Sequence, residues 1–275
     1  MRIAFDGTTL QPRRTGVGYY TEHLLHHLSK ERGADDVVVV SNGPVETARP
    51  LPPEVTTHVS GRHLPRLAWL QFEAPRALRR LGADVAHFTN GMVPVVSSVP
   101  TVVTVHDMSL TLYPQLHPRR RVWLNRPLVD LAVRRADAII TVSQSARADI
   151  VRHYELPPGR VHVVHEAPAP AFKPVRDAGE VARVRARYRL ADRVVLYVGT
   201  IEPRKNLPAL LEAFAAGRRR GTLAGHQLVC VGPYGWLSRD IDARVDALGL
   251  RDVVRFTGYV PFGDLPALYS AAEMF

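Results

Sequence analysis

The sequence predicts an α/β protein made of two doubly wound, Rossmann-like parallel-sheet units, the second of them incomplete. Two observations predict this class. Short runs rich in Val and Ile recur along the 275 residues at intervals too long for hairpins, and stretches with helical periodicity lie between most of them. Strands that alternate with helices of this length form βαβ units, and hence parallel sheets. No apolar run approaches the roughly 20 residues that a membrane-spanning helix needs.

The individual elements follow from the apolar period in each window. The expected strands are residues 2–5, 36–40, 55–59, 84–88, 101–105, 138–142, 161–164, 193–199, 227–232 and 253–258. The expected helices are residues 21–28, 122–133, 145–154, 207–217, 241–249 and 264–275. Four of these helices have at their start a polar residue suited to capping, namely Ser143, Asn206, Ser238 and Asp264. Pro208 and Pro266 fall in first turns, where the missing N–H costs nothing.

One break in composition divides the chain. A proline-rich stretch without periodicity follows His165, which is typical of a domain linker. We therefore expect a first unit at residues 1–165, a linker at 166–178 and a second unit at 179–275. The second unit would have three strands and a bare sheet edge, with a last helix that runs to the chain end. This pattern predicts that the chain is a truncated form of a longer protein.

Charge and cysteine content narrow the function classes. The chain has 36 basic and 26 acidic residues, which give a net charge of +10 and favour an anionic partner such as a phosphorylated substrate, a nucleic acid or an acidic lipid surface. Its single cysteine, Cys230, lies in an apolar run and is expected to be a buried bystander, so no internal disulfide or multi-cysteine zinc site is expected. The N-terminus lacks a signal-peptide pattern, which predicts a cytoplasmic protein.

The first candidate motif is TGVGYY, residues 15–20, between the first strand and the first helix. Gly16 and Gly18 would let backbone N–H groups approach a phosphate, although a plain tight turn explains the glycines equally well. A dinucleotide site is disfavoured, because Thr21 occupies the position of the third glycine. Moreover, the second strand ends in Ser41 and Asn42 instead of a ribose-binding acid, which argues against a nicotinamide oxidoreductase.

The second motif is His106 with Asp107, directly after an apolar strand. Ligands of open α/β sheets bind beyond the carboxyl ends of strands, so this histidine should face the crevice; a capping or supporting role is the alternative. Thr89, Asn90 and Tyr19 lie on loops expected at the same crevice and are candidate acceptor-side residues. No pair of histidines has metal-ligand spacing beside a carboxylate, so no metal site is expected.

The most specific motif is VLYVGTIEPRKNLPALLEAF. A strand ends at Gly199, a short loop carries Thr200, Glu202, Arg204 and Lys205, and a helix follows. Two cations beside a helix N-terminus suit a diphosphate better than a neutral ligand. The loop is not a Walker motif.

Two other patterns are weaker. The string Asp240-Ile-Asp242 lies in an expected helix, where the two carboxylates diverge, and is rejected as a metal site. Residues 61–82 combine Trp69, Phe72 and several leucines with several arginines, which is typical of a basic amphipathic segment on an anionic membrane, while packing against the sheet explains the apolar half equally well. The Arg runs elsewhere lack interleaved aromatics, so no nucleic-acid partner is expected.

Taken together, these motifs resemble the retaining, nucleotide-sugar-dependent glycosyltransferases of family four, also called glycosyl transferases group 1, which have the GT-B fold. The resemblance implies that Arg204 and Lys205 bind the donor diphosphate, with no metal or other cofactor, and that His106 contacts the donor sugar and acceptor. It further implies that Gly16 and Gly18 bring their amides to the phosphate or the acceptor. The loop of Tyr259 and Val260 would border the nucleobase.

Two departures from the family pattern stand out. His165-Glu166-Ala167-Pro168 replaces the family's Asn-Gly-Val-Asp-like turn at the end of the first domain. The family's paired glutamates, which contact the donor sugar and ribose, would begin just after Phe275, and Glu273 is expected to be no substitute because of its place on the last helix. The chain by itself is therefore expected to be inactive.

The resulting hypothesis is transfer of a hexose such as mannose, with retention, from a GDP- or UDP-sugar to a saccharide or lipid-linked acceptor in envelope polysaccharide or glycolipid synthesis. It leaves open a peripheral contact with anionic lipid at the inner face of the membrane. The alternative is a non-catalytic basic module that binds anionic membrane or nucleic acid, which predicts salt-sensitive binding and no response to nucleotide sugars.

Overall fold

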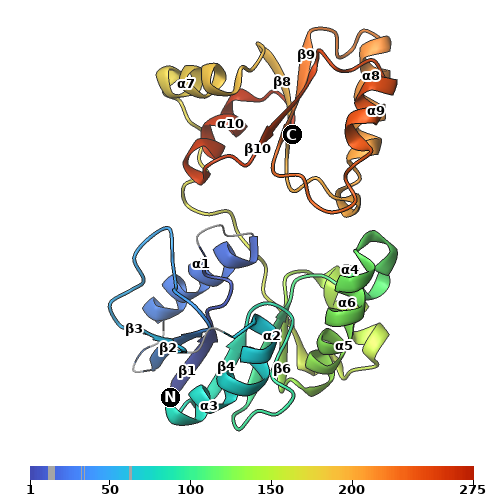
Figure 1. Ribbon diagram of the computed structural model, residues 1–275. Coiled ribbons are helices and arrows are strands. Elements are labelled where there is room, and N and C mark those ends of the chain that lie inside the picture. Colours follow the sequence, from blue (N-terminus) through green and yellow to red (C-terminus); the bar gives the residue numbers. More distant parts are fainter. Residues whose placement is uncertain (12–15, 32, 34, 62–63) are drawn as a thin grey trace. The chain divides into compact units, whose positions relative to one another are not determined.

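The computed structural model describes residues 1–11, 16–31, 33, 35–61 and 64–275 (Figure 1). It divides into two compact units. The first comprises Met1–Pro114 with Arg119–Ala167, and the second comprises Gln115–Pro118 with Pro168–Phe275. Each unit has a parallel sheet with helices packed against it, so the predicted α/β class with two Rossmann-like units is confirmed.

In its described residues, the first unit has a seven-stranded sheet with the order β3-β2-β1-β4-β5-β6-β7, and the neighbouring strands pair in parallel. The strands are β1 Arg2–Asp6, β2 Asp36–Ser41, β3 Val55–Val59, β4 Val85–Phe88, β5 Thr101–Val105, β6 Ala138–Thr141 and β7 Val161–Val163. Each coincides with an expected apolar run. The strand order reverses between β1 and β4, and open α/β sheets bind their ligands outside the carboxyl ends of strands at such a point.

Helices cover both faces of this sheet. They are α1 Gly16–Glu31, α2 Arg66–Ala68, α3 Ala74–Arg80, α4 Ser109–Leu112, α5 Arg119–Arg135 and α6 Gln144–Tyr154, with a π-helical turn, Trp69–Glu73, between α2 and α3. Successive β1 residues point to opposite faces. Phe5 packs with Leu25 of α1, whereas Ala4 packs in the larger core that includes Trp69. Ser143 caps α6 as expected, since its hydroxyl accepts a hydrogen bond from the Ala146 N–H at 3.1 Å.

The second unit has a parallel sheet with the order β10-β9-β8 in its described residues. Its strands are β8 Arg193–Val198, β9 His226–Val231 and β10 Val254–Gly258, and its helices are α7 Ala178–Tyr188, α8 Leu207–Arg219, α9 Ile241–Ala247 and α10 Leu265–Ala271. α7 and α10 lie on one face of the sheet and α8 and α9 on the other (Figure 1). Cys230 of β9 is fully buried, and burial raises the pKa of its thiol to about 12.

Helix α7 is not among the helices expected from periodicity. It begins immediately after Asp177, whose carboxylate accepts the Gly179 and Glu180 N–H groups at 2.8 and 3.4 Å. Two expected caps are wrong in detail, because Ser238 bonds to the Gly235 carbonyl ahead of α9, and the Asp264 carboxylate contacts α7 instead of the first turn of α10. Asn206 precedes α8 in the left-handed region, at φ 50°, without a side-chain cap bond.

The end of the chain corrects two further expectations. The last helix stops at Ala271, and Ala272 is extended at φ −90° and ψ 144°. Glu273 then donates its N–H to the Val194 carbonyl at 2.9 Å, and the Met274 carbonyl accepts the Leu196 N–H at 2.8 Å. The edge of β8 is therefore not bare at these residues, because the chain begins to pair with it in parallel. The position corresponds to that of β4 beside β1 in the first unit.

Among the described residues, no helix combines the length and the apolar character needed to cross a membrane.

Candidate functional site

The loop between β8 and α8 places two cations beside the amino end of a helix. Gly199 and Thr200 follow β8, and a 3₁₀ turn, Pro203–Lys205, leads to α8 through one residue. The positive end of the helix dipole favours an anion, although Pro208 has no N–H and the Ala209 N–H donates to the Asn206 carbonyl at 3.1 Å. Arg204 is half-buried and Lys205 is exposed at this end. The loop therefore places two cationic side chains at the positive end of a helix dipole.

Glu202 determines the direction of Arg204. The side chain of Glu202 is only 3% exposed, and its Oε1 lies 3.0 Å from Arg204 Nε and 2.8 Å from Nη2. Charge-assisted contacts of this kind are strong and directional. Because a buried carboxylate cannot turn to solvent, it limits the rotamers that the guanidinium can adopt. Sequence reasoning placed Glu202 in the cleft without recognising this partner.

Two glycines let the loop after β9 pack against this segment. Gly232 has φ +138°, and a Cβ there would overlap the carbonyl oxygen of Gly199. A Cβ at Gly235 would lie 2.8 Å from Thr200 Cγ2 and 3.0 Å from the Ile201 carbonyl oxygen. The two loops thus approach backbone to backbone, which only glycine permits at Gly232.

Tyr259 and Val260 follow β10 and differ in exposure. Val260 is 5% exposed and packs in the core beneath the sheet, whereas Tyr259 is 57% exposed. The Val260 side chain therefore belongs to the core. Tyr259 alone of the pair presents a ring to the surface.

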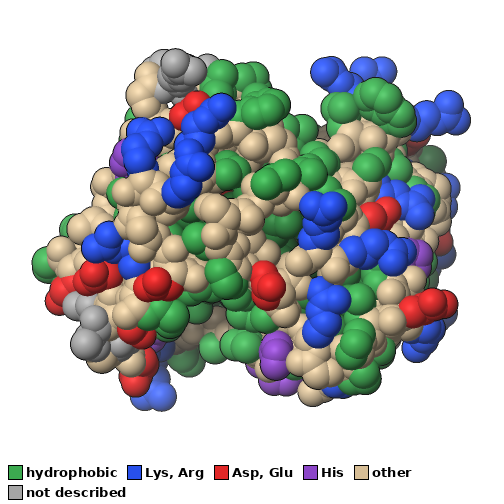
Figure 2. Space-filling view, turned by 90° about the horizontal axis from the view of Figure 1, so that it is seen from below, with side chains coloured by type: hydrophobic (Ala, Val, Ile, Leu, Met, Phe, Trp, Pro, Cys, Tyr) green, Lys and Arg blue, Asp and Glu red, His purple; other side chains and the backbone are tan. Residues whose placement is uncertain are grey.

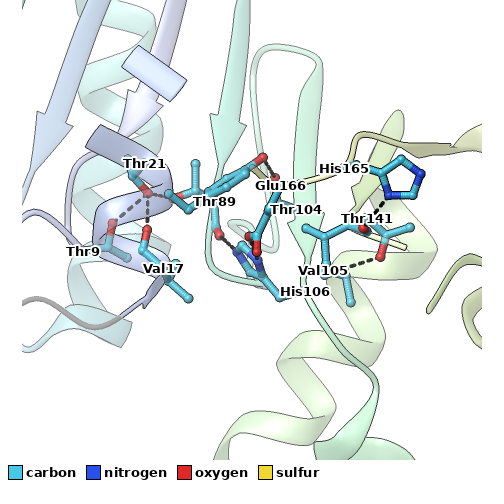
Figure 3. Close-up of polar contacts among 12 residues, drawn as sticks. Thr9, Val17, Thr21, Thr89, Thr104, Val105, His106, Thr141, His165 and Glu166 are labelled. Atoms are coloured by element: carbon cyan, nitrogen blue, oxygen red, sulfur yellow. Dashed lines mark hydrogen bonds and ion pairs between the residues drawn. The ribbon is translucent and has the colours of Figure 1, made fainter. Parts of the chain in front are cut away.

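His106, at the carboxyl end of β5, is held by three elements (Figure 3). Its Nε2 donates to the Thr89 carbonyl at 3.0 Å, from the loop after β4. Its Nδ1 lies 3.2 Å from Oε1 of Glu166, which follows β7. The ring of Tyr20 on α1 meets it edge-on, with centroids 4.8 Å apart at 88°. The His106 side chain is 21% exposed, so it remains partly accessible to solvent.

A chain of hydroxyl groups ties the surrounding loops together. Thr21 Oγ1 donates to the Val17 carbonyl at 2.9 Å and lies 2.7 Å from Thr89 Oγ1 and 3.0 Å from Thr9 Oγ1 (Figure 3). The loops after β1 and β4 are thereby joined to the first turns of α1. Thr21 replaces the third glycine of a dinucleotide motif, and here it acts as a structural connector.

A buried histidine lies next to this site. His87 Nε2 contacts Thr104 Oγ1 at 2.8 Å, and the same hydroxyl lies 3.3 Å from the Tyr20 hydroxyl. Burial, and secondly the charge of His106, lowers the pKa of His87 to about 4. Burial also raises the pKa of Tyr20. Both groups are therefore uncharged at neutral pH, and they support the His106 site without adding charge to it.

Gly16 and Gly18 differ from their expected setting. They lie within the first turn of α1, not in a loop ahead of it, and Thr15 lies outside the described residues. A Cβ on Gly16 would meet no atom within 4 Å, whereas Gly18 is buried. In general, the backbone N–H groups at the start of a helix have no partner within that helix. Tyr19, the residue after Gly18, is half-buried.

The remaining first-unit candidates have more local roles. Asp107 is exposed, and its Oδ1 accepts the Ser109 N–H at 2.8 Å, which supports the start of α4. Asn90 is half-buried in the loop after β4, beside Thr89. Both residues lie at the carboxyl ends of strands, as does His106.

Sequence reasoning missed two charged contacts at this edge. One is Glu166 on His106; the other joins Asp6, at the end of β1, to Arg66 of α2 at 3.7 Å. Arg66 Nε also donates to Thr8 Oγ1 at 3.0 Å. The partners lie about 60 residues apart in each case, so no local spacing reveals them. In the sequence, Asp6 could have been recognised as a candidate by its position directly after the expected strand at residues 2–5.

Glu273 does not lie on a helix, which corrects the sequence-based reason for excluding it. Its carboxylate contacts Arg193 Nε at 3.2 Å and His226 Nε2 at 3.0 Å. Arg193 and His226 are the first residues of β8 and β9. Glu273 therefore lies at the amino ends of these strands, opposite to the carboxyl ends where Arg204 is found. That it cannot replace a donor-binding glutamate stays a prediction, and this position is now the reason for it.

The expected helical setting of the Asp240 and Asp242 string agrees with the structure. Asp240 precedes α9 and Asp242 lies in its first turn, where Oδ1 of Asp242 accepts the Tyr234 hydroxyl at 3.1 Å. In the part of the chain that the structure describes, no group of three or more His, Cys, Asp or Glu side chains could hold a metal ion.

The amphipathic segment at residues 61–82 packs largely inside the first unit. Trp69, Leu70 and Leu78 are at most 1% exposed and belong to its core, while Phe72 is 61% exposed. Its residues Arg62 and His63 lie outside the described residues. The apolar half is therefore explained by packing against the sheet, and not by an exposed amphipathic surface.

The fold consists of two parallel α/β units. One unit has cations at the start of a helix, and the other has a histidine fixed by three contacts. This combination indicates a glycosyltransferase of the GT-B class, and comparison with known proteins supports that class. The family model Glycosyltransferase Family 4 matches residues 14–167, and the model Glycosyl transferases group 1 matches residues 182–275. The chain belongs to glycosyltransferase family 4.

Two curated relatives show how the chain compares with whole proteins. It is 29% identical to O-antigen chain mannosyltransferase B of Escherichia coli, over all of this chain and 75% of that protein. It is 30% identical to alpha-D-kanosaminyltransferase of Streptomyces kanamyceticus, over 76% of this chain and 56% of that protein. The chain thus spans three quarters of the first relative and about half of the second.

Solved structures share the fold. The Anabaena Alr3699/HepE protein in complex with UDP and glucose matches with a TM-score of 0.70 at 18% identity, over 99% of this chain and 72% of that one. WaaG, a glycosyltransferase involved in lipopolysaccharide biosynthesis, matches with a TM-score of 0.70 at 18% identity, over 98% and 73% of the two chains. At these identities the likeness concerns the fold.

Proposed function

We propose that the protein transfers a hexose, with mannose as the first candidate, from a GDP- or UDP-sugar to a saccharide or lipid-linked acceptor, with retention of configuration, in envelope polysaccharide or glycolipid synthesis. The observation that carries the proposal is the Arg204 guanidinium, fixed by buried Glu202 at the amino end of α8. The mannosyltransferase relative supports the sugar, and the UDP and glucose bound to the HepE structure support the kind of donor.

The chemistry follows from where charge develops. When the bond between the anomeric carbon and the diphosphate breaks, the carbon becomes positive and the leaving diphosphate gains negative charge. Arg204, Lys205 and the positive end of the α8 dipole offset that negative charge, and fixed charges and dipoles of this kind are electrostatic catalysts. This arrangement needs neither a metal ion nor another cofactor. The acceptor attacks from the face that the diphosphate leaves, and the departing phosphate oxygen removes its proton.

The two units divide this work. Residues 179–275 bind the nucleotide sugar, with Tyr259 beside the base and the Gly199 and Thr200 backbone near the phosphates. Residues 1–165 bind the acceptor, with His106 as the catalytic residue that contacts both sugars and Gly16, Gly18, Tyr19, Asn90 and Asp107 around it. Residues 166–178 link the two. Nucleotide sugar and glycan are thus the partners, and no nucleic acid is involved.

Replacing Arg204 and Lys205 by Ala tests the diphosphate role. The experiment uses a version of the protein that continues through the family's paired-glutamate segment. We expect kcat/KM for the donor to fall by about 100-fold or more, since single charge-stabilising donors contribute on this scale. Arg219→Ala with Arg220→Ala is the matched control, because these exposed arginines lie at the opposite end of the same helix. Equal activity of the two double variants would exclude the diphosphate role.

A lipid-linked acceptor would bring the protein to a membrane surface, and α5 offers a suitable contact. Its side chain Trp123 is 77% exposed, Leu124 is 38% exposed, and Arg119, Arg120 and Arg121 precede them on the same helix. In Figure 2, Lys and Arg side chains are spread over the face shown, with hydrophobic side chains between them. A basic helix with an exposed Trp is suited to the interface of an anionic bilayer. We place the peripheral contact here instead of on residues 61–82.

Vesicle binding distinguishes the two segments. Arg119→Glu with Arg120→Glu should weaken binding to phosphatidylglycerol-containing vesicles at least tenfold, because each basic residue near the surface contributes about 1 kcal/mol. Arg79→Glu with Arg80→Glu, on exposed positions of α3, should leave binding within about twofold. The reverse pattern would assign the contact to residues 61–82, and no binding by the wild type would remove the membrane contact altogether.

A further inference from the structure

Glu166 occupies a place where this chain departs from its family's turn pattern, and it lies against the histidine of the first unit. We infer that Glu166 is a positioning residue for His106, which it fixes as a hydrogen-bond donor and not as a base. The inference rests on the proposed function, since it assigns the working form of a residue in that site. Neither the family resemblance nor the local spacing points to this pair.

The backbone explains how residue 166 reaches residue 106. After β7, Val164 donates its N–H to the Thr141 carbonyl at 2.9 Å, which continues the alignment with β6. His165 Nδ1 then donates to the Val142 carbonyl at 3.2 Å. These contacts hold the segment beyond the end of β7 against the end of β6 (Figure 3). Glu166 is thereby carried toward the end of β5, next to β6 in the sheet, where His106 lies.

The His106 ring has a defined contact on each side. The Thr89 carbonyl fixes Nε2 at 3.0 Å, Glu166 Oε1 lies 3.2 Å from Nδ1, and Tyr20 packs edge-on against the ring. The Thr89 and Tyr20 contacts come from parts that are themselves joined by the buried Thr21–Thr89 contact. Glu166 is the one charged group among these three contacts. Without it, rotation of the ring about its Cβ–Cγ bond loses its constraint on the Nδ1 side.

The contacts also specify where protons lie. A carbonyl oxygen only accepts, so Nε2 must carry a proton. A carboxylate likewise only accepts, so the approach of Glu166 to Nδ1 is attractive when that nitrogen carries a proton and repulsive when it presents a lone pair. In this arrangement both ring nitrogens are already in contact with protein oxygens, Nε2 with the Thr89 carbonyl and Nδ1 with Glu166, so neither is directed at an acceptor hydroxyl. His106 therefore cannot act as the general base, in agreement with proton removal by the departing phosphate.

The other titratable groups near His106 do not place a negative charge against its ring. His87 is uncharged at neutral pH because burial lowers its pKa to about 4, and Tyr20 is uncharged because burial raises its pKa. Asp107 is exposed, and its carboxylate accepts the Ser109 N–H. The Glu166 side chain is 49% exposed, so the pair contributes little to stability and its removal should not unfold the chain.

Three substitutions of Glu166 separate the effect of its charge from the effect of its shape. Glu166→Gln keeps the shape and removes the charge, Glu166→Asp keeps the charge on a shorter side chain, and Glu166→Ala removes both. Glu54→Gln, at an exposed position ahead of β3, is the matched control. In a version that continues through the paired-glutamate segment, we expect kcat to fall about tenfold in the Gln and Ala variants, with donor KM within about twofold, because small losses of orientation reduce turnover and not binding. The Asp variant should recover part of the loss.

A spectroscopic measurement on this chain is independent of turnover. The ring ¹⁵N signals of His106, assigned by their loss in His106→Gln, should change in Glu166→Gln and stay unchanged in Glu54→Gln. Unchanged ring signals, or changed signals with unchanged kcat, would overturn the inference. If the wild type transfers no sugar, the proposed function fails, while the ring signals still decide whether Glu166 holds His106.

Discussion

At the scale of single residues, the loop that we propose to bind the donor diphosphate depends on one buried carboxylate. Glu202 is 3% exposed and contacts Arg204 through two nitrogen atoms. The arginine would otherwise sample many rotamers on the surface. The loop therefore presents a guanidinium whose direction is set before any ligand arrives, which lowers the entropy cost of binding.

Glu202→Gln tests this preorganisation. Gln has nearly the same shape but only a neutral oxygen for the guanidinium, so we expect GDP or UDP to bind about tenfold more weakly, or about 1.4 kcal/mol. Titration calorimetry with both nucleotides provides the measurement. Glu212→Gln, an exposed carboxylate on α8, should bind like the wild type. Equal affinities for all three proteins would show that Glu202 does not orient the arginine.

Gly232 is the second residue on which the loop depends. Gly232→Ala should destabilise the second unit by more than about 2 kcal/mol, because φ +138° is unfavourable for Ala and its Cβ would overlap the Gly199 carbonyl. Urea denaturation gives the free energy of unfolding. Gly221→Ala, at φ +79° with no atom within 4 Å of the new Cβ, should show only the backbone cost of about 1–2 kcal/mol. Similar losses at both sites would refute the steric argument.

At the scale of elements, strands were easier to predict than helices. Short runs rich in Val and Ile are typical of strands in parallel sheets, and every expected strand is found within about two residues. Helix α7 was missed because its sequence, AGEVARVRARY, is rich in Arg and buries only Val184. For residues 61–82, membrane contact and packing against the sheet both stayed open, because a stripe of apolar residues looks the same whether it faces lipid or a sheet. Only the tertiary contact of Trp69 decides between them.

Asp264 joins two of these elements. Its carboxylate accepts the Tyr188 hydroxyl at 2.6 Å and contacts Arg183 and Arg187 of α7 at 2.8 and 3.0 Å. Burial alone would raise the pKa of Asp264, but the Tyr188 and Arg183 hydrogen bonds and the two positive charges outweigh it, so the pKa lies below its usual value. The carboxylate form is thus favoured in the folded state, and the charged pair holds α7 against α10.

The pH dependence of stability follows from that direction. A folded-state pKa below the unfolded value of about 3.9 gives stability that is fully present above about pH 4–5 and is lost as the pH falls through the folded pKa. Asp264→Asn should lower the free energy of unfolding by about 1–3 kcal/mol at pH 7 and by less at pH 3. Denaturation of both proteins at the two pH values provides the check. A difference that grows toward low pH would contradict this account.

At the scale of the whole molecule, both units begin with the same strand order. β3-β2-β1-β4 in the first corresponds to β10-β9-β8 and the Met274 segment in the second. The strand pattern allowed this architecture to be predicted, and the GTIEPRKN loop led to the diphosphate role that we propose for Arg204 and Lys205. The contacts of His106 could not be predicted, because Glu166 and Thr89 reach it only through folding of distant segments. Glu273 was assigned to the wrong element because a helical period does not reveal where a helix stops.

Separate cores predict separate unfolding. Trp69 is buried in the core of the first unit, so in a Trp123→Phe, Trp236→Phe background its fluorescence reports on that unit alone. GDP or UDP at 100 times its dissociation constant should stabilise the unit that binds it by about 2.7 kcal/mol. Circular dichroism should therefore show a nucleotide-dependent transition that Trp69 fluorescence does not follow. A shift of the Trp69 transition by the same amount would place nucleotide binding in the first unit.

The single thiol of the chain has a practical consequence. Cys230 is fully buried and its pKa is raised to about 12, so thiol-directed dyes should leave the native protein unlabelled. Cysteines introduced at one exposed position in each unit can then carry a donor and an acceptor dye without first removing the native one. Energy transfer between them would report in solution how the distance between the two units responds to nucleotide sugar and acceptor.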